Sequence, residues 1–124
     1  MIESWTDHAR RRVVLALTGD VSGPDYVAWL MDALTAEPVL GGYDFVYDLL
    51  AYEGRISHDD IAALAPRYAA QVGEADRGAM TVLVTTDEGF RFWAELFAVQ
   101  FPNRAWRVVP GMAEAEAVLA VPRG

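Results

Sequence analysis

One short run, Ser57-His58-Asp59-Asp60, contains the residue types of a nucleophile, a general base and an acidic partner. At the start of a helix, adjacent side chains point in different directions, so these groups would not face one another as a catalytic triad requires. A serine with an acidic residue three positions later instead resembles a helix capping box, with Asp60 in place of Glu or Gln. We therefore expect Ser57 to cap a helix, and the sequence indicates no catalytic residue.

The residue types also do not indicate a metal site or covalent catalysis. Cysteine is absent, and the two histidines, His8 and His58, lie far apart in the chain without carboxylates at ligand spacing. All ten basic residues are arginine, which excludes a Schiff-base lysine and the phosphate-binding lysine of a P-loop. The sequence therefore predicts no metal site and no cofactor.

A few polar residues near predicted strand ends resemble parts of phosphate-binding or phosphorylation sites. Asp20, Asp48 and either Thr85 or Thr86 fall where phospho-receiver domains hold an acidic pocket, but that mechanism also needs a lysine. The run 18–23 resembles the hydroxyl- and glycine-rich loop of a flavin-phosphate site, yet it places Asp20 where the anion would lie. Neither pattern supports the corresponding function.

Composition sets the outer limits of function. The chain has 124 residues, 53% of them hydrophobic, with a net charge of −8 that would repel nucleic acid. No apolar run approaches the ~20 residues of a membrane-spanning helix, and the first residues do not resemble a signal peptide. We expect a single domain over residues 1–124, located in the cytoplasm, with no nucleic-acid partner and no integral membrane association.

The elements that must position these residues follow an alternation of β-branched or apolar runs with helical periodicity. Such alternation is typical of βα units and predicts an α/β fold, with a four- or five-stranded mixed sheet. The paired strand and helix ranges are Val13–Thr18 with Pro24–Ala36, Tyr43–Leu50 with His58–Val72, Met80–Thr86 with Glu88–Phe101, and Arg104–Val109 with Met112–Leu119.

The positions of two strands within the sheet can also be predicted. The strand that contains Asp48 is apolar on both faces, because Phe45, Tyr47 and Leu49 alternate with Val46 and Leu50. It should therefore lie inside the sheet. The short run 2–5 should form an antiparallel hairpin with the first long strand and lie at an edge.

Two of the predicted helices carry special features. Ser22 or Gly23 should cap the first helix, with Pro24 at its first position. Pro66 falls inside the second helix, which should therefore be kinked or start late.

The third predicted helix is apolar on two sides. One side, which should pack on the sheet, contains Phe90, Trp93, Ala94, Phe97 and Phe101. The second side carries a stripe formed by Phe92, Leu96 and Val99. Such a stripe needs something to bury against: the fourth helix or a terminus, a second subunit, or an apolar ligand, and Trp29 on the first helix could extend the patch.

Several segments together resemble the SpoIIAA-like proteins. These segments are the opening Met-Ile-Glu, the strand Val-Val-Leu-Ala-Leu-Thr-Gly, and Tyr-Asp-Leu-Leu-Ala-Tyr-Glu-Gly after the central strand. The family consists of small bacterial domains of the STAS type, which are also similar in shape to the CRAL-TRIO lipid-binding fold. Asp48, Tyr52 and Gly54 occupy the places of its strand-end and turn motif. The later residues Trp93, Phe97, Arg107 and Glu114–Leu119 are similar to its third helix, last strand and final helix.

The resemblance implies a non-catalytic regulatory or binding module, with an apolar small molecule or lipid as the expected ligand. The stripe formed by Phe92, Leu96 and Val99 predicts a homodimer, because a copy of the same helix across a two-fold axis would cover it. The alternative that it implies is an anti-sigma-factor antagonist, in which a partner kinase phosphorylates a serine at the start of the helix after the central strand. Ser57 stands at that place, nine residues after Asp48, although the family's Asp-Ser-Ser-Gly sequence around it is missing. An unidentified enzyme is the third reading.

Overall fold

The computed structural model describes residues 1–123. In chain order its elements are β1 (Ile2–Asp7), β2 (Arg12–Leu17), α1 (Gly23–Ala36), the 3-10 helix η1 (Pro38–Gly42), β3 (Asp44–Asp48), α2 (His58–Val72), β4 (Met80–Val84), α3 (Glu88–Gln100), β5 (Ala105–Val109) and α4 (Met112–Ala120). The predicted strands and helices are all present, with ends that differ from the predicted ones by at most two residues. Only η1 was not predicted.

The five strands form one mixed sheet whose spatial order is the chain order, β1-β2-β3-β4-β5. β1 pairs antiparallel with β2, with Ile2 opposite Leu17, and every other neighbouring pair is parallel. β3 is therefore the central strand and β1 an edge strand, which confirms the predicted topology.

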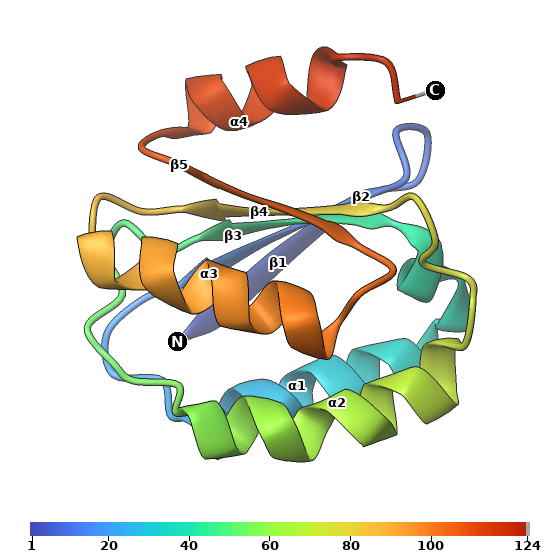
Figure 1. Cartoon of the computed structure of the whole chain (residues 1–124), viewed down its shortest axis with the longest axis horizontal. Helices are drawn as coiled ribbons and strands as arrows, with labels where there is room; N and C mark the ends of the chain where they lie inside the picture. The colour runs from blue at the N-terminus through green and yellow to red at the C-terminus, as the bar shows by residue number, and fades with distance from the viewer. Residues whose placement is uncertain (124) are drawn as a thin grey trace.

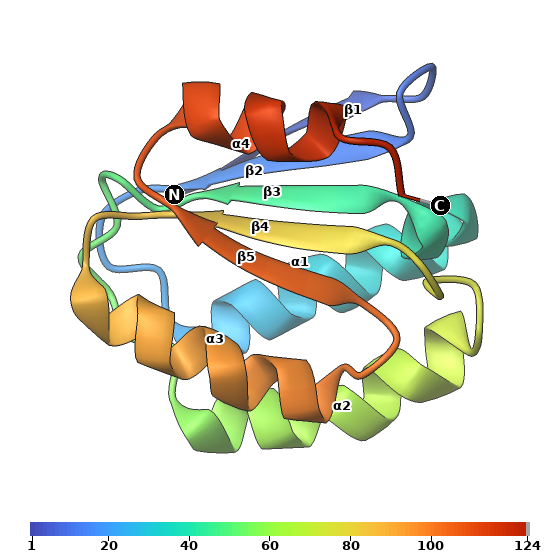
Figure 2. The same cartoon turned by 45° about the horizontal axis from the view of Figure 1, so that its top comes forward.

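Helices cover the two faces of the sheet unequally (Figure 1): α1, α2 and α3 lie on one face, and α4 lies alone on the other. Figure 2, the same view tilted by 45°, shows α4 on the side of the sheet opposite α1, α2 and α3, where α4 contacts β4 and β5. Residues of β3 alternate between the two layers: Phe45 and Tyr47 belong to the core under the three helices, and Val46 belongs to the core under α4. This division of the core defines the three-helix face and the α4 face.

Local capping chemistry fixes where the helices start. Ser22 caps α1 by accepting a hydrogen bond from the Asp25 N–H, and Pro24 lies in the first turn, as predicted. α2 begins at His58 and continues through Pro66 to Val72, so the proline neither delays nor ends the helix.

Candidate functional site

Ser57 lies on the surface at the start of α2 and makes a complete capping box. Its Oγ accepts a hydrogen bond from the Asp60 N–H at 3.1 Å and donates one to Asp60 Oδ2 at 2.8 Å. The same carboxylate oxygen accepts from the Ser57 N–H at 3.0 Å. The cap that the sequence predicted is present, and the hydroxyl remains exposed to solvent.

The loop from β3 to α2 holds Ser57 in place through the predicted motif residues. Asp48 Oδ1 accepts from the Leu50 N–H at 3.1 Å and so shapes the turn after β3. The Tyr52 hydroxyl donates to the Val21 carbonyl at 2.8 Å, which ties this loop to the one before α1. Gly54 lies so close that an added Cβ would stand 2.6 Å from that same carbonyl oxygen, so only glycine fits. These residues position Ser57 and touch no reacting group.

The starts of α1 and α2 lie against each other at this end of the molecule. A Cβ added to Gly23, the first residue of α1, would overlap the Asp60 carboxylate of α2. Asp60 is thus placed near two helix N-termini, whose backbone N–H groups carry partial positive charge. The Ser57 hydroxyl donates a hydrogen bond to the Asp60 carboxylate, whose negative charge balances the partial positive charge of these helix N-termini.

The apolar stripe formed by Phe92, Leu96 and Val99 is not covered within residues 1–123. Phe92 is 65% exposed and Val99 is 77% exposed, whereas Leu96 is half-buried. The expectation that α4 covers the stripe is wrong, because α4 lies on the other face of the sheet. Trp29 belongs to α1 and is partly buried against the core of the three-helix face.

The stripe and Ser57 are joined by a short row of rings. The His58 imidazole, next to Ser57, lies with its ring centroid 6.3 Å from that of Trp93 on α3. Trp93 in turn contacts Phe92 edge-on, with centroids 6.5 Å apart. The structure therefore brings two sequence-predicted features, the capping serine and the apolar stripe, onto neighbouring parts of one surface.

Beneath α2 and α3, the three-helix face encloses an apolar cavity of about 70 Å³. Its walls come from the sheet and from all three helices, and they are mostly aliphatic and aromatic side chains. Residues that line it include Leu17, Leu30, Phe45, Leu49, Leu64, Leu83, Phe97 and Phe101. Of the lining residues, Ile56, Phe90 and Trp106 are half-buried, so the cavity approaches the surface beside these side chains.

Two tyrosines bring polar atoms into the cavity wall. The hydroxyls of Tyr26 on α1 and Tyr47 on β3 are 2.6 Å apart and share one hydrogen bond. Burial raises the pKa of both hydroxyls above the ordinary value of 10, so both stay protonated in neutral solution.

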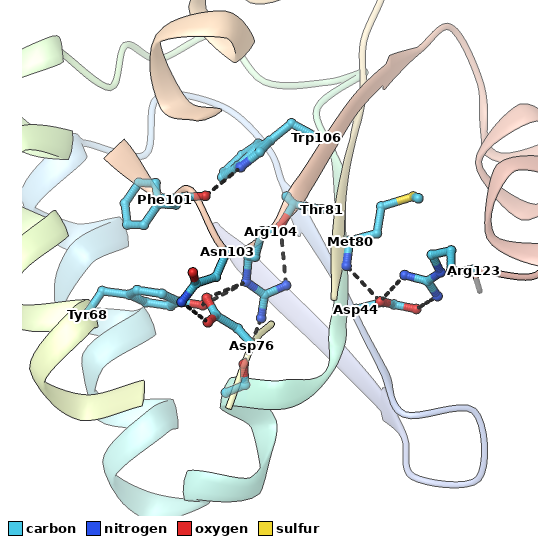
Figure 3. Close-up of polar contacts among 11 residues, drawn as sticks. Asp44, Tyr68, Asp76, Met80, Thr81, Phe101, Asn103, Arg104, Trp106 and Arg123 are labelled. Atoms are coloured by element: carbon cyan, nitrogen blue, oxygen red, sulfur yellow. Dashed lines mark hydrogen bonds and ion pairs between the residues drawn. The ribbon is translucent and has the colours of Figure 1, made fainter. Parts of the chain in front are cut away.

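A buried arginine cluster also contributes to the cavity wall through Arg104 and Tyr68, and Figure 3 shows its polar contacts. Arg104 donates from Nε to the Tyr68 hydroxyl at 2.7 Å and from Nη2 to the Gly41 carbonyl at 2.9 Å. The Tyr68 hydroxyl donates to Asp76 Oδ2 at 2.7 Å, and that oxygen lies 3.6 Å from Arg104 Nε. Burial raises the pKa of Tyr68, although Arg104 opposes the shift. The arginine charge is thus balanced by a buried carboxylate.

The sequence does not indicate these cavity residues as a group. Its periodicity predicts Tyr47 only as an apolar residue of the central strand, without a polar role. Arg104 was only the start of a strand. A tyrosine inside an otherwise apolar periodic pattern is the one signal that could have pointed to a buried hydroxyl.

The structure supports no metal centre among residues 1–123, where no group of three or more potential metal-ligating side chains gathers. Asp48 and Thr85 accept hydrogen bonds from nearby backbone N–H groups, at Leu50 and Asp87 respectively. Over the same residues, no helix is both long and apolar enough to span a membrane.

Comparison with solved structures finds a similar fold. The chain is similar to the Bacillus cell fate determinant SpoIIAA in its phosphorylated form, with a TM-score of 0.58 and 13% sequence identity. The match covers 96% of this chain and 99% of that one. No protein-family model and no curated protein sequence matches the chain. The fold is therefore SpoIIAA-like, as the sequence resemblance predicted.

Proposed function

We propose that this chain is a non-catalytic regulatory module, a single SpoIIAA-like domain that binds a protein partner and is switched by phosphorylation of Ser57. The observation that carries the proposal is the exposed Ser57 hydroxyl at the start of the helix after the central strand, in a fold similar to that of phosphorylated SpoIIAA. The function is thus of the anti-sigma-factor-antagonist type. We propose a cytoplasmic location for this function, because the kinase that would phosphorylate Ser57 needs ATP.

Phosphorylation would change the local chemistry in a definite direction. A phosphate adds about −1.5 to −2 charges and removes the hydroxyl hydrogen that Ser57 donates to Asp60. The helix dipole favours the new charge, but Asp59 and Asp60 oppose it. We expect the capping box to open and the Asp60 side chain to turn away.

The partner surface in this proposal runs from Ser57 along His58 and Trp93 to the apolar stripe. Exposed apolar side chains such as Phe92 provide contact area, and a phosphate within such an interface disrupts binding through charge and desolvation. Phosphorylated protein should therefore bind the partner more weakly than the unmodified protein.

Substitution of Ser57 tests this function. Ser57→Ala should cost about 1 kcal/mol of stability through the lost cap, and Ser57→Asp should be nearly neutral because Asp also caps helices. In the source cell, Ser57→Asp should abolish co-purification of the partner, and mass spectrometry of the wild type should find phosphate on Ser57.

Ser22 provides a matched control, because it caps α1 in the same way. Ser22→Asp adds the same charge to the neighbouring helix start and should leave the partner bound. If Ser57→Asp retained the partner, or if both substitutions released it equally, the phospho-switch would be rejected.

A homodimer is one way to cover the stripe, and we propose it as the resting assembly. Because Phe92 is largely exposed, Phe92→Glu should not disturb folding. Sedimentation should then show a dimer for the wild type and a monomer for the variant. A monomeric wild type would exclude self-association and leave the stripe to a different protein.

The apolar cavity favours a second candidate function, the binding of a small apolar ligand. The cavity shares with small-molecule sites a mostly apolar wall that contains a few polar groups, and its volume of about 70 Å³ would admit only part of a small molecule. Native mass spectrometry of protein purified from its own host tests this function, since a bound ligand would add mass that denaturation removes.

A further inference from the structure

The Tyr26 and Tyr47 hydroxyls share one hydrogen bond, and this leaves one of their two O–H groups without an acceptor in the part of the chain that the structure describes. Two protonated hydroxyls carry two hydrogens, and the single bond between them uses one. Among residues 1–123 neither hydroxyl has another hydrogen-bond partner, so one O–H donor remains unused in a buried site. Buried donors without an acceptor are rare and costly, which makes this donor a feature to be explained.

Water is a poor acceptor for this site. A buried water usually makes about three hydrogen bonds. Most of the wall is apolar, and the other polar lining groups, on Tyr68, Thr81 and Arg104, already bond one another, Asp76 and the Gly41 carbonyl. A molecule that needs a single hydrogen bond and is otherwise apolar matches the wall better.

The size of the cavity restricts the shape of that molecule. Its volume of about 70 Å³ is about half of the ~150 Å³ that holds a benzene ring in an engineered apolar cavity. A rigid ring therefore does not fit, whereas the narrow end of an unbranched chain does. The chain can leave past Ile56 and Phe90, where the cavity approaches the surface.

The electrostatics favour a neutral group. The only cation in the lining, Arg104, is already balanced by Asp76, which is 2% exposed. A carboxylate in the cavity would be an additional buried charge without its own counter-ion, which is costly. A carbonyl oxygen accepts a hydrogen bond without that cost.

We propose that the apolar cavity binds a neutral, unbranched aliphatic molecule with one carbonyl oxygen, and that the Tyr26–Tyr47 pair donates the hydrogen bond to that oxygen. The proposal rests on the second candidate function, ligand binding in this cavity, and adds the chemical class of the ligand. Its polar end points inward and its chain points toward the loop that precedes Ser57.

Two probes separate the proposal from the function on which it rests. 2-Hexanone carries the carbonyl and the chain, and xenon reports only the apolar space. In the wild-type protein, both should shift the methyl NMR resonances of lining residues such as Leu64 and Leu83.

The decisive variant is Tyr26→Phe together with Tyr47→Phe. A single substitution is not enough, because the remaining hydroxyl would keep its hydrogen for the ligand. The double variant should bind 2-hexanone at least about fivefold more weakly, as the loss of one neutral hydrogen bond predicts, and should bind xenon as before. Retained xenon binding also shows that the variant has folded.

Two further variants complete the test. Tyr43→Phe removes a buried tyrosine hydroxyl that bonds His8 and does not line the cavity, so both probes should bind it as they bind the wild type. Leu83→Phe fills the cavity and should abolish the binding of both 2-hexanone and xenon. Equal 2-hexanone affinity in the wild type and the double variant would overturn the carbonyl proposal alone. Failure of both probes in the wild type would overturn ligand binding itself.

Discussion

The two faces of the sheet are built from alternate residues of the same strands, yet they pack differently. The α4 face consists almost entirely of small and aliphatic side chains, namely Val46, Met80, Val82, Val84, Val109, Ala115 and Leu119. The three-helix face contains tyrosines and phenylalanines, a buried arginine cluster and the apolar cavity. Protein interiors are close-packed in general, so the apolar cavity sets the three-helix face apart from the α4 face. Space for a ligand is therefore present on one face of the sheet.

The largest loss of stability is expected from a substitution that breaks the buried arginine cluster on the three-helix face. Arg104→Leu removes the cation that balances Asp76, and both side chains are almost fully buried. Leaving one buried charge unpaired typically costs 3–5 kcal/mol, so chemical denaturation should show a loss of about that size. Adding Asp76→Leu should restore part of the loss, because the orphaned charge is gone. A double variant as unstable as the single one would contradict this account.

A pair of enlargements tests the difference in packing directly. Ala115→Leu adds bulk to the closely packed α4 face and should destabilise by about 1–3 kcal/mol. Leu83→Phe adds bulk toward the cavity, and we expect less than about 1 kcal/mol from it. Thermal melting of the two variants and the wild type measures the two stability losses. Equal losses would show that the three-helix face has no usable space.

The smallest expected effect concerns the ion pair that ties the segment after α4 to the sheet. Arg123 donates to both carboxylate oxygens of Asp44, at 2.8 and 2.6 Å. Burial raises the pKa of Asp44, but the hydrogen bonds from Arg123 and the Met80 N–H outweigh it, so the net pKa lies below the ordinary 3.8. A depressed carboxyl pKa stabilises the fold above pH 4, and this stabilisation is lost as the pH falls through the folded-state value.

Arg123→Ala should therefore cost roughly 0.5–1 kcal/mol at pH 7, a value reduced for solvent screening because the arginine side chain is 35% exposed. The cost should shrink below pH 4, as urea titrations at several pH values would show. Arg77→Ala, which removes only a surface pair with Glu74, should cost less at pH 7, because both of its side chains are more than 70% exposed. A cost that stayed constant down to pH 2 would exclude the proposed linkage.

Most of the fold could be predicted from periodicity and capping residues. Strand alternation around Phe45 placed β3 in the middle of the sheet, and Ser57 with Asp60 gave the start of α2. These signals are local, because they depend on neighbours within a few residues of the chain. The helix η1 escaped prediction because its glycines and proline are equally typical of a plain turn.

The candidate site was predicted only in part, for a physical reason. Ser57 and the stripe on α3 are visible in the sequence, since a cap and a helical repeat are local patterns. The Tyr26–Tyr47 pair and the Arg104–Asp76 contact join residues 21 and 28 positions apart in the chain. Such contacts depend on how helices lie on the sheet, which no local pattern specifies.

The order of the strands has a consequence for where any ligand can bind. In many open α/β sheets the strand order reverses once, and the helices on either side of the reversal diverge to leave a crevice at the carboxyl ends of the strands. Here the order never reverses, and right-handed crossovers that all advance in one direction leave every connecting helix on the same side. This topology provides no switch-point crevice. Binding space must instead lie inside a layer, between the sheet and its crowded helices.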